Sequence, residues 1–143
     1  MIDRRVVCNK LSQLRERLQT LRVLAAEPLG QFSADPVKRG AAERLLQVSI
    51  EICLDVGHHL IARLNLPRPT EYRDVFRILG ERKILAPDFA ARLEKMAAFR
   101  NRLVHLYAEI EPAQVHEYLQ NNLPDFDEFA RVVAAVVKEP KAK

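Results

Sequence analysis

The sequence predicts an all-α fold, a single-domain bundle of five to six helices over residues 1–143, with its core over about residues 3–138. Apolar residues recur at spacings of three and four in several segments, which is the period of an amphipathic helix. Glycine is scarce, with 4 among 143 residues, and this disfavours turn-rich β architectures. No segment alternates between apolar and polar residues as a strand does, and residues 139–143 are expected to form a frayed tail.

The first helix is predicted between residues 3 and 26. Its apolar residues follow the helical period: Val7, Leu11, Leu14, Leu18, Leu21 and Ala25. Residues 28–36 are rich in proline, glycine, serine and aspartate, and this composition predicts a connecting loop. Asp35 followed by Pro36 is a favourable cap and first-turn pair for the next helix.

The second predicted helix spans about residues 37–64. It is apolar around most of its circumference, so we expect it to be the buried centre of the bundle. One narrow polar stripe at spacings of three and four interrupts this surface: Arg44, Gln47, Glu51, Asp55 and His58. Because polar side chains are seldom buried, the stripe marks a face that meets water, a partner or a functional site.

Prolines and glycines divide the remainder of the chain into shorter helices. Thr70 is expected to cap the first of these, which Gly80 ends. The predicted helices after it are, in order, residues 87–107 beginning at Pro87, residues 112–122 beginning at Pro112, and residues 125–138 following Pro124.

Composition limits the compartment of the protein and the kinds of site it can hold. Cys8 and Cys53 lie far apart and lack the paired spacing of a zinc site, so we expect reduced, buried thiols. His58 and His59 point to different sides of a helix, and two carboxylates alone do not form a metal site, so no metal or other cofactor is assigned.

No secretory segment precedes the first helix, and apolar runs such as residues 132–137 are far shorter than the roughly 20 residues of a membrane span. We therefore expect a cytoplasmic protein that does not enter a membrane.

The formal net charge of +4 favours encounter with polyanions such as RNA, or with an acidic protein partner. Much of the excess lies in the first predicted helix, which includes Arg15 and Arg22. A charged face of this kind is also typical of an ordinary solvated helix, so the charge alone does not identify a partner.

Polar and ionisable side chains crowd residues 99–107, the C-terminal part of an otherwise apolar helix. At about 100° per residue, Asn101 and His105 share one stripe, and Arg100 and Tyr107 share the adjacent one. The helix is therefore expected to carry a compact polar patch.

Two residues of this patch suit the cleavage of RNA without a metal. That reaction needs a base for the 2′-hydroxyl proton, an acid for the 5′-oxygen and a cation beside the phosphorane. His105 suits proton transfer because imidazole gains and loses a proton near neutral pH, and Arg100 suits the charged phosphate because guanidinium is a planar, permanent cation. An arginine and a histidine on a helix are, however, more often a surface ion pair or a packed histidine, so spacing alone leaves both interpretations open.

Three further residues are candidates for supporting roles. Asn101 could orient the imidazole of His105, or bind a phosphate or a 2′-hydroxyl. Glu51 and Asp55, one turn apart, could orient Arg100 or raise the basicity of His105. They could equally pair with the arginine and histidine of their own stripe. Because one histidine does not easily act as both base and acid, a two-fold dimer would supply the second.

The spacing of Arg100, His105 and Tyr107 resembles the Arg-x4-His-x-Tyr motif of HepT toxins in the HEPN superfamily. The similarity covers most of the chain, about residues 3–135. Its other matching stretches are Arg44–Gln47 with Glu51 and Asp55–Gly57, Pro67–Pro69 with Tyr72, and Arg100–His105. The motif alone is degenerate, but its combination with the helical order and the long apolar helix makes the resemblance specific.

The resemblance implies a HEPN-like homodimer in which the two Arg-His helices line a shared cleft. It implies the toxin of a toxin-antitoxin system, a metal-independent endoribonuclease that cleaves cellular RNA, such as tRNA or mRNA, with Arg100 and His105 catalytic. It also implies an MntA-like nucleotidyltransferase antitoxin that transfers AMP from ATP to Tyr107. Such AMPylation would add an anionic, bulky group beside the two catalytic residues and block the cleft.

Two other functions remain open at this point. The helical dimer could be a non-catalytic partner that binds nucleotide or substrate for a nucleotidyltransferase, in which case RNA stays intact. It could also be a scaffold that docks an acidic protein through its basic first helix, in which case charge reversal at Arg15 and Arg22 matters more than His105.

Overall fold

The computed structural model describes residues 2–105 and 110–138, and these residues form seven α-helices and no strand. In chain order the helices are α1 (Arg4–Ala25), α2 (Leu29–Ala34), α3 (Pro36–Arg63), α4 (Tyr72–Glu81), α5 (Pro87–Val104), α6 (Pro112–Asn121) and α7 (Leu123–Lys138). The predicted all-α class is confirmed. The tail predicted at residues 139–143 lies outside the described residues.

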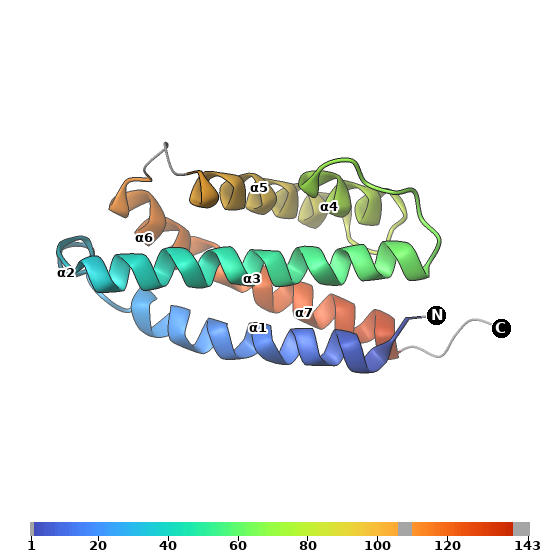
Figure 1. The fold of residues 1–143 in the computed structure, drawn as a ribbon, viewed down its shortest axis with the longest axis horizontal. Coiled ribbons are helices and arrows are strands. Elements are labelled where there is room, and N and C mark those ends of the chain that lie inside the picture. The colour runs from blue at the N-terminus through green and yellow to red at the C-terminus, as the bar shows by residue number, and fades with distance from the viewer. Residues whose placement is uncertain (1, 106–109, 139–143) are drawn as a thin grey trace.

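Helix α3 is the centre of the bundle and contacts each of the other six helices (Figure 1). Helices α4 and α5 pack on one side of it, and α1 and α7 pack on the other. By length and composition alone α3 could cross a membrane. The prediction from sequence rested on shorter apolar runs such as residues 132–137 and did not consider this helix. However, 56% of its most apolar window is buried inside the bundle, which is the pattern of a core helix.

Most of the helices begin where the sequence supplies a cap or a proline. Asp3 accepts the backbone N–H of Val6 at 3.2 Å at the start of α1. Asp35 accepts the N–H groups of Val37 and Lys38 at 2.9 and 3.3 Å, with proline in the first turn of α3, as predicted. These bonds satisfy donors that the first turn of a helix leaves without a partner.

At the start of α4 the cap differs by one residue from the prediction. Glu71 occupies the cap position, and its backbone N–H donates to the Asp74 carboxylate at 3.1 Å. The hydroxyl of Thr70 donates to the same carboxylate at 2.8 Å, so Thr70 supports the cap without occupying it.

The segment predicted as a loop contains a short helix, α2. Its composition is typical of a loop, but Phe32 lies at its centre and is 0% exposed. Burial of a phenylalanine side chain stabilises a fold by roughly 1.5–3 kcal/mol, which outweighs the low helix propensity of the residues around it. The packing of Phe32 therefore accounts for the additional helix.

Gly80 does not end α4, contrary to the prediction. The helix continues to Glu81, and the chain turns at Lys83, which has a positive φ of 64°. A Cβ at Gly80 would lie 2.6 Å from Cβ of Ala90. Glycine is therefore needed at this position for the close approach of α4 and α5.

Two smaller predictions were also wrong. Pro124 lies inside the first turn of α7, where the missing N–H of proline costs no helical hydrogen bond, so it does not separate the helix from what precedes it. Cys8 is exposed because it lies on the solvent side of α1, whereas Cys53 is buried as predicted.

Candidate active site

Arg100, in the last turns of α5, is held against α3 by Glu51. The Nε and Nη2 atoms of Arg100 donate to Oε2 of Glu51 at 3.1 and 2.8 Å, while Nη1 donates to Oδ1 of Asn101 at 3.3 Å. A guanidinium has five N–H donors, so two remain for another acceptor. The side chain of Arg100 is only 16% exposed. These contacts fix a cation at the surface with spare donors.

Two further side chains complete this arrangement. The ring of Tyr72, at the start of α4, lies under the guanidinium of Arg100, 4.6 Å from ring centroid to Cζ. On α3, Nε2 of Gln47 donates to Oε2 of Glu51 at 3.2 Å, one turn before it. Arg100 is therefore contacted by residues of three helices, which restricts its rotamer.

The electrostatics of Glu51 follow from this pairing. Partial burial by itself would raise the pKa of its carboxyl, but hydrogen bonds from Arg100 and Gln47, with the charges of Arg100 and Arg44, lower that pKa below its usual value. Glu51 is therefore ionised at neutral pH and serves as a counter-ion and hydrogen-bond acceptor for Arg100.

His105 lies immediately after α5, not within it. The helix ends at Val104, and the backbone of His105 is extended, with φ −79° and ψ 117°. Phe99 is the last buried side chain of α5, and in the final turn Leu103 packs only partly against the core, so packing supports this end of the helix less than its middle. The expectation that the helix continues through His105, with Asn101 and His105 on one stripe, was therefore wrong.

The imidazole of His105 is exposed. Within the described part of the chain it has no hydrogen bond or ion pair. It follows Arg100 by five residues, about one helical turn and a half, which corresponds to a rise of about 7 Å. The exposed imidazole is therefore available to a molecule that binds at this end of α5.

The other predicted site residues are placed as follows. Asp55 does not contact Arg100 but pairs with Nζ of Lys10 on α1 at 3.3 Å, an interaction that the sequence did not indicate. Asn101 contacts Arg100, not His105. Tyr107, the expected site of AMPylation, lies outside the described residues, as do the residues on either side of it.

Two other histidines make hydrogen bonds to the backbone of distant residues. His116 donates from Nε2 to the backbone oxygen of Glu27 at 2.7 Å and packs against Phe32, so it has a structural role. Nε2 of His59 accepts the backbone N–H of Asp3 at 3.1 Å. Within residues 2–105 and 110–138, no group of three or more His, Cys, Asp or Glu side chains could hold a metal ion.

Sequence reasoning missed two contacts of this site. Gln47 was part of the polar stripe, and its spacing of four residues from Glu51 is a signal that could have indicated their hydrogen bond. Nothing local in the sequence indicates that the ring of Tyr72 lies under Arg100, because that contact depends on how α4 packs on α5.

Comparison with known proteins adds family information to this geometry. A family model described as "Ribonuclease HepT-like" matches residues 6–133. The chain is 26% identical over 130 residues to the mRNA nuclease HepT of Shewanella oneidensis, covering 91% of this chain and 97% of that protein. It is 31% identical over 91 residues to the tRNA nuclease HepT of Aphanizomenon flos-aquae, covering 64% of this chain and 62% of that protein.

A solved structure shares the fold. It is the tri-AMPylated Shewanella oneidensis HEPN toxin in complex with MNT antitoxin, with a TM-score of 0.85 and 26% identity, covering 91% of this chain and 97% of that chain. Because the family model matches most of the sequence, the resemblance seen in the motifs is confirmed: this chain belongs to the ribonuclease HepT-like family.

Proposed function

We propose that this protein is the toxin of a toxin-antitoxin system and acts as a metal-independent endoribonuclease on cellular RNA. The observation that carries the proposal is the Arg100 guanidinium, fixed by Glu51 with two donors to spare, five residues before the exposed imidazole of His105. Membership of a ribonuclease family and relatives named as mRNA and tRNA nucleases support the substrate class.

In the proposed reaction, the 2′-oxygen of a ribose attacks the adjacent phosphorus as its proton leaves, and the bond from phosphorus to the 5′-oxygen breaks. The products are a 2′,3′-cyclic phosphate and a 5′-hydroxyl, so no water is consumed in this step. Arg100 binds the non-bridging oxygens and stabilises the charge that develops on the phosphorane. His105 transfers a proton, either from the 2′-hydroxyl or to the 5′-oxygen.

The reaction needs a second proton-transfer group, which a homodimer would supply. Two copies related by a two-fold axis would bring two Arg100–His105 pairs to one cleft, one histidine acting as base and the other as acid. Glu51 and Asn101 are positioning residues in this proposal, since they touch Arg100 and not the substrate.

The regulation that we propose is AMPylation of Tyr107 by an MntA-like nucleotidyltransferase antitoxin in the cytoplasm. Tyr107 follows His105 by two residues, so AMP on its hydroxyl would bring an anionic phosphodiester close to the residues that bind RNA. The structurally similar Shewanella oneidensis toxin is tri-AMPylated and in complex with an MNT antitoxin, which supports this partner class.

The experiment that tests the proposal uses purified protein whose unmodified state is verified by mass spectrometry. Wild type, His105→Ala and Arg100→Ala are incubated with total RNA and tRNA in EDTA, and the product ends are mapped. Arg131→Gln, an exposed arginine on α7, is the matched control for loss of positive charge. Circular dichroism and size-exclusion chromatography verify that each variant is folded and has the wild-type oligomeric state.

We expect wild type and Arg131→Gln to yield discrete products with 2′,3′-cyclic phosphate ends. Loss of His105 should lower the rate by roughly 100-fold or more, and loss of Arg100 by roughly 100- to 1,000-fold. Intact RNA with folded, unmodified wild-type protein would contradict the proposal and support the non-catalytic, nucleotide-binding partner instead.

A further inference from the structure

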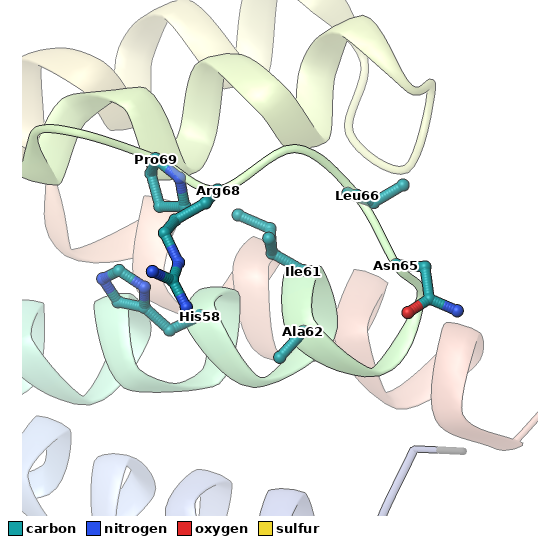
Figure 2. A pocket seen from close by; sticks show the side chains of 7 residues that line it. All are labelled: His58, Ile61, Ala62, Asn65, Leu66, Arg68 and Pro69. Atoms are coloured by element: carbon teal, nitrogen blue, oxygen red, sulfur yellow. The ribbon is translucent and has the colours of Figure 1, made fainter.

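A pocket of about 440 Å³ lies between the C-terminal half of α3 and the connection that leads to α4 (Figure 2). Its polar lining comes from His58, Asn65 and Arg68, and its apolar lining includes Ile61, Leu66 and Pro69. This combination of donors and an apolar wall is typical of a site for a small polar group attached to a less polar body.

The pocket contains two donor side chains with no acceptor among the described residues. Figure 2 shows the side chain of Arg68 reaching from the connection back toward the ring of His58 on α3. Neither side chain has a hydrogen bond or ion pair with any residue that the structure describes. A guanidinium facing an imidazole without an intervening carboxylate leaves a place for an anion.

The carboxylates nearest in sequence to His58 and Arg68 do not occupy this anion site, because each pairs with another residue. Asp55, one turn before His58, pairs with Lys10 at 3.3 Å. Glu71, three residues after Arg68, pairs with Arg73 at 3.3 Å. Neither carboxylate therefore forms an ion pair with a donor of the pocket.

The pocket is continuous with the surface that leads to Arg100. A smaller hollow of about 160 Å³ shares His58 and Pro69 with it and extends past Thr70 and Glu71 to Tyr72. The guanidinium of Arg100 stacks on the face of the Tyr72 ring. Along α3, His58 follows Glu51 by seven residues, two turns on the same face, which corresponds to about 10 Å. The pocket is therefore separate from Arg100 but lies on the same stretch of surface.

We propose that the pocket binds a phosphodiester of the RNA strand that flanks the one held at Arg100. His58 and Arg68 donate to its oxygens, and the apolar wall contacts the attached ribose or base. This inference rests on the proposed ribonuclease function. RNA fits better than an acidic peptide because a single strand carries phosphates at regular intervals and can occupy both anion sites at once.

The test measures binding of two non-cleavable probes, 2′-O-methyl oligonucleotides of mixed sequence with two and with eight nucleotides. The variant combines His58→Gln and Arg68→Gln, and Arg131→Gln is the matched control on α7, which does not line the pocket. Dissociation constants are measured by fluorescence anisotropy over a range of salt concentrations. Thermal unfolding and size-exclusion chromatography verify that the fold and oligomeric state are unchanged.

The double variant should bind the longer probe at least roughly tenfold more weakly than wild type, since hydrogen bonds to charged groups are strong. The loss should be smaller for the dinucleotide, which cannot span both sites. The slope of log K against log salt should fall in magnitude by about 0.7, the value for one phosphate of a single strand. Arg131→Gln should show neither effect.

Other outcomes overturn the inference. Equal binding of the longer probe by wild type and the double variant would show that the pocket does not contact RNA. Unchanged RNA binding with weakened binding of the nucleotidyltransferase partner would assign the pocket to a protein contact. Absence of RNA binding by wild type would overturn both the pocket and the proposed function. If wild type binds RNA without cleaving it, the proposed function fails, and weaker binding by the double variant still supports the pocket.

Discussion

Substitution of Glu51 by glutamine tests whether this carboxylate holds Arg100 in place. Oε2 of Glu51 accepts two hydrogen bonds from Arg100, at 3.1 and 2.8 Å, and the side chains are 32% and 16% exposed. Glutamine has nearly the same shape as glutamate but carries no charge, and it presents one acceptor oxygen. The change therefore weakens the contact without creating a cavity on α3.

The expected loss of stability follows from this partial burial. Hydrogen bonds to charged groups contribute about 1.5–3 kcal/mol, whereas exposed ion pairs contribute about 0–1 kcal/mol. Because glutamine retains one weaker bond, we expect the free energy of unfolding to fall by about 1–2 kcal/mol. For a domain of this size that corresponds to a decrease in Tm of about 3–8 °C.

The pH dependence of this loss has a defined sign. The folded state lowers the pKa of Glu51, so its stabilising effect is fully present above the ordinary carboxyl range and is lost as pH falls through the lowered value. The difference in Tm between wild type and Glu51→Gln should therefore be largest at neutral pH and shrink in acid. Thermal unfolding between neutral and acidic pH measures it.

Activity gives a second readout that a purely structural role would not change. If Arg100 moves by about 1 Å, the rate can fall by about 100-fold, so we expect kcat for RNA cleavage to fall roughly 10- to 100-fold with a smaller change in KM. The matched control is Asp55→Asn, which removes the same charge one turn away, where Asp55 pairs with Lys10 at an exposed position. We expect that control to retain kcat and to change the free energy of unfolding by less than about 1 kcal/mol.

Two results would refute this reasoning. Wild-type kcat in Glu51→Gln, measured well below its Tm, would show that Glu51 does not position Arg100. Equal losses in Glu51→Gln and Asp55→Asn would show that the negative charge of the α3 face matters, and not the hydrogen bonds to the guanidinium.

Three further predictions concern the bundle itself. Gly57→Ala should lower the free energy of unfolding by about 1–3 kcal/mol in denaturant titration, because its Cβ would collide with Cγ1 of Val75; unchanged stability would mean that α4 shifts freely. Native protein should react with a maleimide at exposed Cys8 and not at buried Cys53, because burial raises the pKa of the Cys53 thiol. Mass spectrometry identifies the labelled site, and labelling of both thiols would contradict the burial of Cys53. Tyr118→Phe should leave Tm unchanged or raise it, because the buried hydroxyl has no hydrogen-bond partner among the residues that the structure describes. A large decrease in Tm would contradict this.

The parts of the fold that depend on local sequence were predictable. The cap at Asp35 and the apolar circumference of α3 each follow from residues close together in the chain. The helix at α2 and the close approach at Gly80 depend on residues far apart in sequence, since Phe32 packs against His116 and Gly80 against Ala90. Local composition cannot indicate such packing.

The same distinction applies to the site. The spacing of Arg100 and His105 identified them as candidates, and Glu51 was considered as a partner of either one or of its own stripe. Choosing among these required the register between α3 and α5, which the structure provides through the hydrogen bonds to Arg100. The extended backbone of His105 was not predictable, because the helical pattern of apolar residues continues up to Val104.

The contrast between Arg100 and His105 fits the different demands of their proposed roles. A group that stabilises transition-state charge works best when it is fixed before the reaction, and Arg100 is held by Glu51, Asn101 and the ring of Tyr72. A group that transfers protons must reach substrate atoms, and the imidazole of His105 is exposed beyond the end of the helix. Because Glu51 would remain partly buried without its cation in Arg100→Ala, that variant should lose stability as well as activity. Loss of activity in Arg100→Ala would therefore support a catalytic role only where its folded fraction is measured alongside, whereas His105→Ala removes no hydrogen bond or ion pair with the described residues.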